Sequence, residues 1–435
     1  MLILNTKDPD FETEFKKLHQ KLLTIPPRVQ QTVVQIFKHI TRRRDKTLFL
    51  YTRRFDQHRI NGQTVRVSGE ELNKAQKLVP KEDLHILRFA ALRIRNFHKH
   101  QIREGFRIKD SAGAVLEQRI IPLRRVGLCI PAGTAPLAST VLMTAIPARL
   151  AGVKEIVMIS PWPGGETSPH ILAAAELAGV KEIYKVGGVQ GIAAMALGTE
   201  SIPRVEKIVG PGNIWVNAAK LFAFQRGLVD IDTLAGPSEV VIVGDGTVPA
   251  PFAASDLLSQ AEHGVDSVAI LITTSKDYAG KLIQELRRQA KVLSRMTMLQ
   301  MAFRRNMRII VCGGLKEAAD LVNRIAPEHL EIHTRRPREF LKRVYNASSV
   351  FLGPYSPVPL GDYLAGPNHV LPTAGRASFA SPLGVDEFIK TQSITSFTRA
   401  AFKEVAPHAQ RFALLEGLDA HARSVAIRLK NPKNK

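Results

Sequence analysis

The polar residues of segment 231–264 are the first candidates for chemistry in this sequence. If residues 250–263 form a helix, Asp256, Gln260 and His263 have i, i+4, i+7 spacing and share one face among apolar neighbours. Such a row either caps the helix end and satisfies a buried network, or holds a metal ion or a substrate. This segment alone leaves both interpretations open.

Three downstream groups carry similar residue types. Glu328 and His329 enter a predicted strand, where an imidazole could act as a general base near neutral pH and a carboxylate could activate water. A solvent-facing glutamate beside a hydrogen-bonded histidine is the alternative. Asp362 and His369 lie seven residues apart on a Gly- and Pro-rich loop. The third group, Glu416 and His421, lies in a predicted C-terminal helix.

Taken together, these groups contain a plausible set of nitrogen and oxygen ligands for a metal. The set is Gln260 or Glu262, His263, Asp362 and His421. Two imidazoles with carboxylate or amide oxygens suit zinc, with manganese and cobalt as competitors. Sequence spacing cannot bring groups so far apart together, so the metal site is a hypothesis here.

The elements that must position these residues follow two patterns. Residues 1–105 have helical periodicity, including a helix opened by Ser68 with Glu71 in a capping-box pattern, and a short strand is expected at 63–67. From about residue 115, strands alternate with helices, which favours parallel, doubly wound sheets. The predicted strands are 126–130, 155–159, 182–186, 240–243, 267–273, 307–311 and 330–333.

The predicted fold is therefore α/β, with two tandem doubly wound, incomplete Rossmann-like units, a helical N-terminal arm and a helical C-terminal tail. The expected domains are 1–24, 25–128 with 237–378, 129–236, and 379–435. No strand is followed by G-x-G-x-x-G, but glycine-rich turns at 131–133, 187–188 and 210–213 follow strands and leave a nucleotide site open.

Composition narrows the class of protein. The 435 residues contain no apolar run long enough to span a membrane and no signal-peptide pattern, and two cysteines are too few for a disulfide framework. A cytoplasmic location is expected. The net charge of +22 comes from scattered pairs and triplets of basic residues rather than one stripe, so a nucleic-acid partner is not favoured.

Motifs along nearly the whole chain resemble the histidinol dehydrogenase family. They include VGLCIPAGTAPLASTVLM at 126, VGGVQGIAAMALGTESIPRVEKIVGPGN at 186, APEHLEI at 326, VFLGPYSP at 350, GDYLAGPNHVLPTAG at 361 and EGLDAHARSVAIRL at 416. The resemblance implies a zinc-dependent homodimer that oxidises L-histidinol through L-histidinal to L-histidine with two NAD⁺. It places zinc and catalysis on 25–128 with 237–378, and NAD⁺ on 129–236.

The resemblance also implies a role for each matching residue. The implied zinc ligands are Gln260, His263, Asp362 and His421, and the implied catalytic pair is Glu328 and His329. The implied substrate contacts are Ser238, Gln260, His263, Glu328, His329, Asp362, His369, Glu416 and His421. Glu416 and His421 are expected to act in the partner subunit's site, so that the 379–435 domain completes it.

The residues expected to bind NAD⁺ depart from the usual sequence of the family. Cys129, Gln190 and Asn213 match the NAD⁺-binding positions, but the usual Tyr-Val-Pro-Gly-Gly is Cys129-Ile130-Pro131-Ala132-Gly133 here. Cys129 is interpreted as a small apolar filler rather than a nucleophile.

Three other hypotheses for the function of the protein stay open. They are a relative that oxidises another amino or sulfonated alcohol, a zinc hydrolase with the same ligands, and a nucleic-acid-binding protein.

Overall fold

The computed structural model describes residues 2–20, 25–132, 136–234, 236–293 and 296–430. Gly133, part of the glycine-rich turn expected at 131–133, falls outside these ranges. The chain divides into two compact units. Unit 1 contains residues 1–101 and 123–388, and unit 2 contains residues 102–122 and 389–435.

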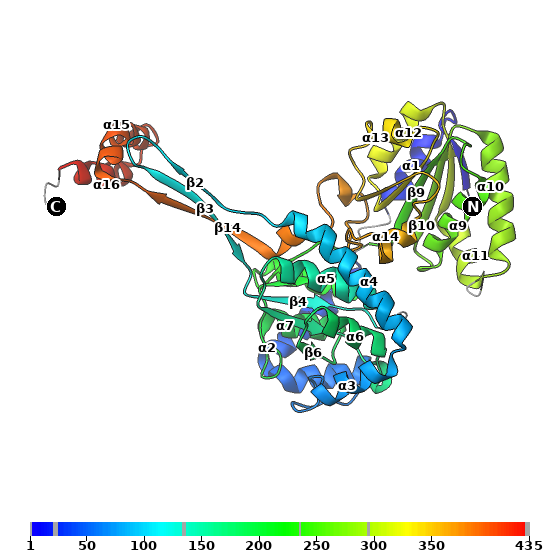
Figure 1. Ribbon diagram of the computed structural model, residues 1–435, viewed down its shortest axis with the longest axis horizontal. Coiled ribbons are helices and arrows are strands. Elements are labelled where there is room, and N and C mark those ends of the chain that lie inside the picture. Colours follow the sequence, from blue (N-terminus) through cyan, green and yellow to red (C-terminus); the bar gives the residue numbers. More distant parts are fainter. Residues whose placement is uncertain (1, 21–24, 133–135, 235, 294–295, 431–435) are drawn as a thin grey trace. The chain divides into compact units, whose positions relative to one another are not determined.

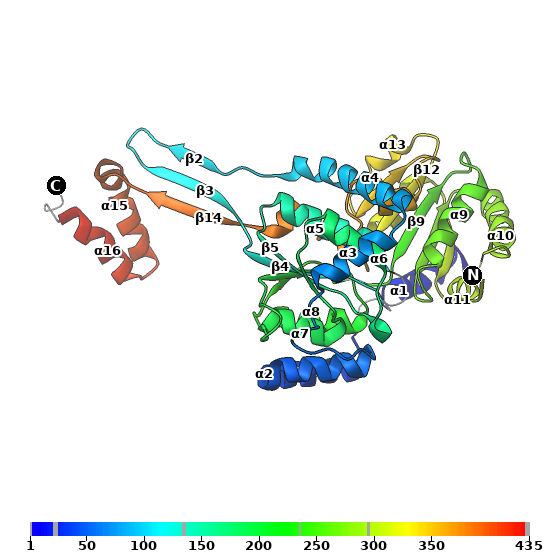
Figure 2. The same cartoon turned by 60° about the horizontal axis from the view of Figure 1, so that its bottom comes forward.

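Unit 1 contains a five-stranded parallel sheet in the order β6-β5-β4-β7-β8. Its strands are β4 (Arg125–Cys129), β5 (Glu155–Ile159), β6 (Glu182–Tyr184), β7 (Lys207–Val209) and β8 (Asp230–Ile231). Helices cover both faces, so the central strands are apolar on both sides, as parallel sheets require (Figure 2).

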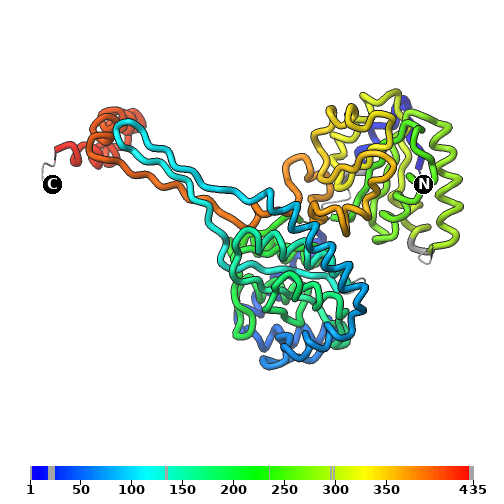
Figure 3. Tube along the Cα trace, in the orientation of Figure 1, coloured from blue at the N-terminus to red at the C-terminus, as the bar shows by residue number. Residues whose placement is uncertain are grey.

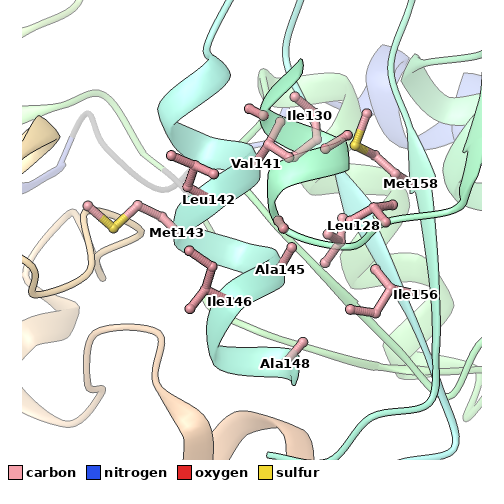
Figure 4. Packing of buried hydrophobic residues seen from close by; sticks show 14 of the residues in the cluster. Leu128, Ile130, Val141, Leu142, Met143, Ala145, Ile146, Ala148, Ile156 and Met158 are labelled. Carbon is pink, nitrogen blue, oxygen red and sulfur yellow. The ribbon is translucent and has the colours of Figure 1, made fainter. Parts of the chain in front are cut away.

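The helices on one face of this sheet are α3 (Gly69–Leu78), α4 (Lys81–His98), α5 (Ala138–Leu150) and α6 (Pro169–Leu177). Leu128 and Ile130 pack against Val141 and Ala145 of α5 there (Figure 4). The helices on the other face are α2 (Pro27–Phe55), α7 (Gly188–Leu197) and α8 (Ile214–Gln225). Ser68 forms the predicted capping box with Glu71 at the start of α3.

Unit 1 also contains a six-stranded parallel sheet in the order β1-β11-β10-β9-β12-β13. Its strands are β1 (Leu2–Asn5), β9 (Glu239–Gly244), β10 (Val268–Thr273), β11 (Met307–Val311), β12 (His329–His333) and β13 (Ser349–Leu352). One face packs on α9 (Ala250–Ala261), α10 (Lys276–Ala290) and α11 (Met296–Arg305). The other packs on α1 (Phe11–Gln20), α12 (Leu315–Ile325) and α13 (Pro337–Leu341) (Figure 1).

Chain order in this sheet reverses at β9. Strands β10 and β11 extend the sheet on one side of β9, whereas β12 and β13 extend it on the other. The pair β9 and β12 is therefore the switch point of the sheet.

The short helix α14 (Val358–Tyr363) follows β13. The 3₁₀ turns of unit 1 are Lys99–Gln101, Pro163–Gly165, Arg376–Ser378 and Val385–Phe388.

Unit 2 combines a three-stranded antiparallel sheet with two helices. The strands β2 (Phe106–Lys109), β3 (Val115–Pro122) and β14 (Ile389–Ser396) pair in the order β14-β3-β2, so segments almost 300 residues apart run side by side (Figure 3). Helices α15 (Arg399–Leu415) and α16 (Asp419–Lys430) follow.

The α/β fold with parallel sheets is confirmed, but the expected domain boundaries differ from the observed packing. Helices α2, α3 and α4 pack on the five-stranded sheet rather than on the sheet formed by 239–352, because their apolar faces meet α5–α8. The N-terminal arm contributes strand β1 as well as a helix. The C-terminal domain incorporates 102–122, because β3 is the strand that pairs with β14.

Two local expectations also change. Residues 63–67 form only an isolated bridge, Arg66 to Tyr184, rather than a strand. The single C-terminal helix expected to carry Glu416 and His421 is two helices, because Gly417 adopts a left-handed conformation with φ of 72° between them. In the part of the chain that the structure describes, no helix has the length and apolarity needed to cross a bilayer.

Candidate active site

His329 is the first residue of β12 and lies beside β9. Its Nδ1 is 3.1 Å from the backbone carbonyl oxygen of Glu239. Because a carbonyl only accepts, Nδ1 carries the proton, and the neutral imidazole presents a basic Nε2. Burial, with smaller effects from His263 and His369, lowers the pKa of His329 to about 4. The ring is therefore neutral near pH 7.

Glu328 is held by an interlocked pair of contacts with Glu239. The backbone N–H of Glu239 donates to Glu328 Oε2 at 2.8 Å, and the N–H of Glu328 donates to Glu239 Oε1 at 3.3 Å. Glu328 Oε2 is also 3.5 Å from His329 Nδ1. Burial, with Glu239 and Asp362 nearby, raises the pKa of Glu328 well above its usual value.

Asp362 and His369 join the same cluster. Asp362 lies on α14, with Oδ1 at 3.8 Å from His329 Nε2, and burial raises its pKa to about 6. The backbone carbonyl of Asp362 accepts from His369 Nδ1 at 2.8 Å, and His369 Nε2 is 3.2 Å from the Thr140 hydroxyl of α5. Burial lowers the pKa of His369 to about 4.

Gln260 and His263 approach this cluster from the end of α9. The helix ends at Ala261, two residues earlier than expected, and the N–H of His263 donates to the Gln260 carbonyl at 3.3 Å in the turn that follows. His263 is close enough to lower the pKa of both His329 and His369. Gln260 is 2 % exposed, and its buried Nε2 has no hydrogen-bond partner among the described residues.

The cluster lies at the amino ends of β9 and β12. Ser238 directly precedes β9, and its carbonyl accepts from the N–H of Val268. Ligands of open α/β sheets usually bind at the carboxyl ends of the strands. This cluster also lies at the switch point of its sheet, but at the amino ends of the strands instead of the carboxyl ends. The reason is that α9 runs back antiparallel to the strands and brings Gln260 and His263 to the amino edge.

Glu416 and His421 belong to unit 2. Glu416 is the C-cap of α15, and His421 lies in α16, so they are on different helices rather than on one. Both side chains are exposed on unit 2. Within this unit they are therefore accessible to another surface.

The three residues predicted on the cofactor side lie at the carboxyl ends of the five-stranded sheet. Cys129 ends β4, and Asn213 caps α8 by accepting from the N–H groups of Trp215 and Val216. Gln190 is buried and donates Nε2 to Asp56 Oδ2 at 3.3 Å. Burial raises the pKa of the Cys129 thiol to about 12, which agrees with a filler and not with a nucleophile.

A second group of metal-ligand types lies next to this cluster. Asp256, Glu331 and His333 place one donor atom each within 4.8 Å of one another, so they form a possible metal-binding triad. The predicted set differs from this triad. Gln260, His263 and Asp362 fit a metal by donor type and because the buried amide of Gln260 has no hydrogen-bond partner among the described residues. His421, the fourth predicted ligand, lies exposed on unit 2.

Sequence reasoning missed residues that hold the catalytic candidates. Glu239 contacts both Glu328 and His329, and burial raises its own pKa to about 7. Thr140 contacts His369 from α5, a helix that packs on the five-stranded sheet. Glu239 directly follows Ser238, and a charged residue at the start of an otherwise apolar strand was an available signal. Nothing in the sequence signalled the contact of Thr140 with His369.

Comparisons with known proteins show the family to which the chain belongs. A family model described as histidinol dehydrogenase matches residues 23–429. A histidinol dehydrogenase from Bacillus cereus is 47% identical over 421 residues, covering 97% of each chain. One from Syntrophotalea carbinolica is 44% identical over 431 residues, covering 99% of this chain and 100% of that one. The crystal structure of histidinol dehydrogenase from Elizabethkingia anophelis superposes with a TM-score of 0.93 at 38% identity, covering 99% and 98%.

Proposed function

Because the chain belongs to the histidinol dehydrogenase family, an oxidoreductase family of histidine biosynthesis, we propose that it oxidises L-histidinol through L-histidinal to L-histidine with two NAD⁺. The observation that supports this most directly is the neutral His329, whose basic Nε2 faces Asp362 beside the buried Glu328. An acid–base pair in one buried cluster suits a reaction with two oxidations and one hydration.

The chain's residues divide the work as follows. His329 Nε2 accepts the proton of the substrate hydroxyl, while the Glu239 carbonyl fixes the tautomer. Glu328 takes a proton from the water that hydrates the aldehyde, and its raised pKa makes it a stronger base once ionised. His369 is held at both ring nitrogens and serves to bind and orient substrate, together with Ser238, which directly precedes β9.

Gln260, His263 and Asp362 would hold zinc, with His421 and the substrate contact Glu416 supplied by the second copy of a homodimer. A zinc ion held there would supply a Lewis acid for a substrate that carries nitrogen ligands, and the residues around it would orient the hydroxymethyl carbon. Gln260 lies on α9, His263 in the turn after it, and Asp362 on α14. Both helices contact β12, α9 through Asp256 and His333 and α14 through Val358 and Glu331. The acidic groups Glu328, Asp362 and Glu416 suit a cationic substrate.

The NAD⁺ that accepts hydride would bind at the carboxyl ends of β4 and β7, the switch point of the five-stranded sheet. Cys129, Gln190 and Asn213 are the residues proposed to contact it. The Gly210 turn allows a close approach of the backbone, because a Cβ there would lie 2.3 Å from the Cys129 carbonyl oxygen. We further propose a cytoplasmic enzyme without a nucleic-acid partner.

The test is NADH formation from L-histidinol, with and without a chelator. We expect two NADH per L-histidinol, loss of activity on chelation and recovery on adding Zn²⁺. The variant Asp320→Ala, at an exposed position of α12, serves as a control for handling. Absence of NADH, or activity that survives removal of all measured metal, would contradict the proposal.

A further inference from the structure

A proline inside α5 leaves one carbonyl of this buried helix without its usual donor. Pro147 lies within α5 and has no backbone N–H. The carbonyl of Met143, four residues earlier, therefore lacks the hydrogen bond that an α-helix normally provides. Asn368 supplies a donor from outside the helix, with Nδ2 at 2.6 Å from the Met143 carbonyl oxygen. Asn368 is 4% exposed, so this bond is shielded from solvent.

The residue after Asn368 makes a second bond to the same face of α5. The Thr140 hydroxyl lies 3.2 Å from His369 Nε2. Thr140 precedes Met143 by three residues, so the two positions are neighbours on the helix surface. Figure 4 shows Met143 on the other side of α5 from Ala145, which packs on the sheet. Two consecutive residues of one segment thus bind two neighbouring positions of one helix.

Close packing around these two bonds shows that the whole segment 364–370 is docked. Val370 is buried in the apolar cluster that contains α5, and Leu364 packs against the same cluster. Gly366 has φ of +109°, and a Cβ there would lie 2.9 Å from the Arg93 carbonyl oxygen of α4. The segment follows α14, which contacts the six-stranded sheet, yet it packs on helices of the five-stranded sheet.

We propose that Thr140 and Asn368 are positioning residues of the substrate site, which fix the ring of His369 by docking segment 364–370 on α5. His369 Nδ1 donates to the Asp362 carbonyl, so Thr140 is the partner of the other ring nitrogen. With both nitrogens engaged, His369 presents a ring of fixed orientation to the substrate. This inference rests on the proposed function only for the identity of the substrate that the ring meets.

The same helix begins beside the proposed cofactor site. The N–H of Leu137, the N-cap of α5, donates to the Pro131 carbonyl at 3.4 Å, in the turn that follows β4. One helix therefore contacts the cofactor turn at its start and the substrate segment along its first two turns. Loss of the docking bonds should displace His369 without disturbing the proposed NAD⁺ contacts, because those lie on β4, on α7 and at the cap of α8.

Two substitutions of Thr140 separate positioning from packing. Thr140→Val keeps the shape of the side chain but removes the hydroxyl, whereas Thr140→Ser keeps the hydroxyl. We expect Thr140→Val to raise the KM for L-histidinol about tenfold and to leave the KM for NAD⁺ unchanged, because one buried hydrogen bond is lost on the substrate side alone. Thr140→Ser should keep the wild-type KM for both substrates. A purely structural role would lower the amount of folded enzyme without changing either KM.

The matched control is Thr144→Val, one turn further along α5. Thr140 and Thr144 are both 0% exposed, but the Thr144 hydroxyl donates within the helix. Its acceptors are the carbonyls of Thr140 at 2.7 Å and Val141 at 3.3 Å. Thr144→Val should therefore leave the KM for L-histidinol at the wild-type value.

Nitrogen NMR of enzyme with labelled histidines tests the contact itself, independently of turnover. The Nε2 signal of His369, identified by its absence in His369→Asn, should move in Thr140→Val toward that of a nitrogen without a hydrogen bond. Thr140→Ser and Thr144→Val should leave the signal in place. If the wild type does not oxidise L-histidinol, the proposed function fails, whereas this spectrum still decides whether Thr140 holds the ring.

A double-mutant cycle tests the role of the proline. In Pro147→Ala the new N–H can donate to the Met143 carbonyl, so this carbonyl no longer depends on Asn368. Asn368→Ala should lower the midpoint of denaturant unfolding, and should lower it less in the Pro147→Ala background. The inference is overturned if Thr140→Val leaves the Nε2 signal or the KM for L-histidinol unchanged, if Thr144→Val changes them equally, or if Asn368→Ala is equally destabilising in both backgrounds.

Discussion

Glu328 and His329 are adjacent in sequence but are held by different groups of Glu239. The carboxylate of Glu328 accepts from the backbone N–H of Glu239, whereas the His329 ring donates to its backbone carbonyl. Both contacts involve the backbone of β9, so substitutions at Glu328 and His329 can change one function at a time. This allows the two proposed chemical roles to be separated.

The first prediction concerns these two roles. Glu328→Gln keeps an oxygen for the N–H of Glu239 but removes the base, so oxidation of L-histidinal should fall by about 10²- to 10⁴-fold while alcohol oxidation changes far less. His329→Asn can still donate to the Glu239 carbonyl but lacks Nε2, so both steps should fall. NADH formation measured separately from L-histidinol and L-histidinal checks this. Equal residual rates for both steps in both variants would refute the assignment.

Sequence reasoning reached the residues whose types are themselves distinctive. Glu328, His329, Asp362 and His369 were proposed from residue type and spacing, and distances of 2.8–3.8 Å link them in the structure. Their proposed roles, and those of Gln260 and His263, stay predictions. Glu239 and Thr140 were missed because their roles depend on which strand and helix become neighbours, and this is not encoded in local spacing. Asp256 was predicted to share a face with Gln260, but its partner Glu331 could not be identified without the fold.

At the scale of elements, the turn after β7 shows how a backbone position can serve the proposed cofactor site. Gly210 has φ of +114° and lies against the Cys129 carbonyl. Its own carbonyl accepts from Lys220 Nζ at 3.1 Å, and Lys220 also forms a buried ion pair with Asp232. The turn is therefore fixed between β4, β8 and α8, and leads directly to Asn213.

The second prediction concerns this turn. Gly210→Ala would place a Cβ 2.3 Å from the Cys129 carbonyl oxygen, so the turn must shift. We expect the free energy of unfolding to fall by about 3 kcal/mol and kcat/KM for NAD⁺ to fall by about tenfold or more.

The matched control is Gly227→Ala. Gly227 has φ of +63°, and no atom lies within 4 Å of the added Cβ. It should lose only about 1 kcal/mol, with unchanged kinetics. Denaturant unfolding and steady-state kinetics provide both readouts, and similar effects of the two substitutions would contradict this account.

Most of the α/β elements could be predicted because their apolar periodicity is local. The strands 155–159 and 307–311 have the expected bounds. The sheet of unit 2 was missed, because its strands alternate weakly and lie mostly exposed, and β3 finds its partner β14 only through long-range pairing. The break at Gly417 was also missed, although glycine at a helix end is the usual signal.

The sequence predicts two α/β sheets across the chain, but residues 25–101 were expected to pack on the six-stranded sheet and pack on the five-stranded sheet instead. Helix α2 is amphipathic, and an amphipathic helix shows which of its faces is buried without showing which sheet buries it. The contacts of α2 with α7 and α8 decide the matter. The same packing leaves Asp56 half-buried at the end of α2, where its only described side-chain hydrogen bond is the one from Gln190.

The third prediction follows from that burial. Burial raises the pKa of Asp56 from 3.8 to about 6, so the folded state binds its proton more tightly than the unfolded state does. Stability from this group is therefore present below pH 4 and is lost as the pH rises through 6. Asp56→Asn cannot ionise, and its amide oxygen can still accept from Gln190. The variant should match the wild type near pH 4 and be more stable by about 1–2 kcal/mol at pH 8, which is less than the full pKa shift implies because the group is partly solvated.

Denaturant unfolding across this pH range checks the sign of the effect. The exposed Asp320→Asn is the control and should show no such divergence from the wild type. A wild type more stable than Asp56→Asn at pH 8 would show that the ionised carboxylate is stabilised by its contacts rather than penalised by its burial.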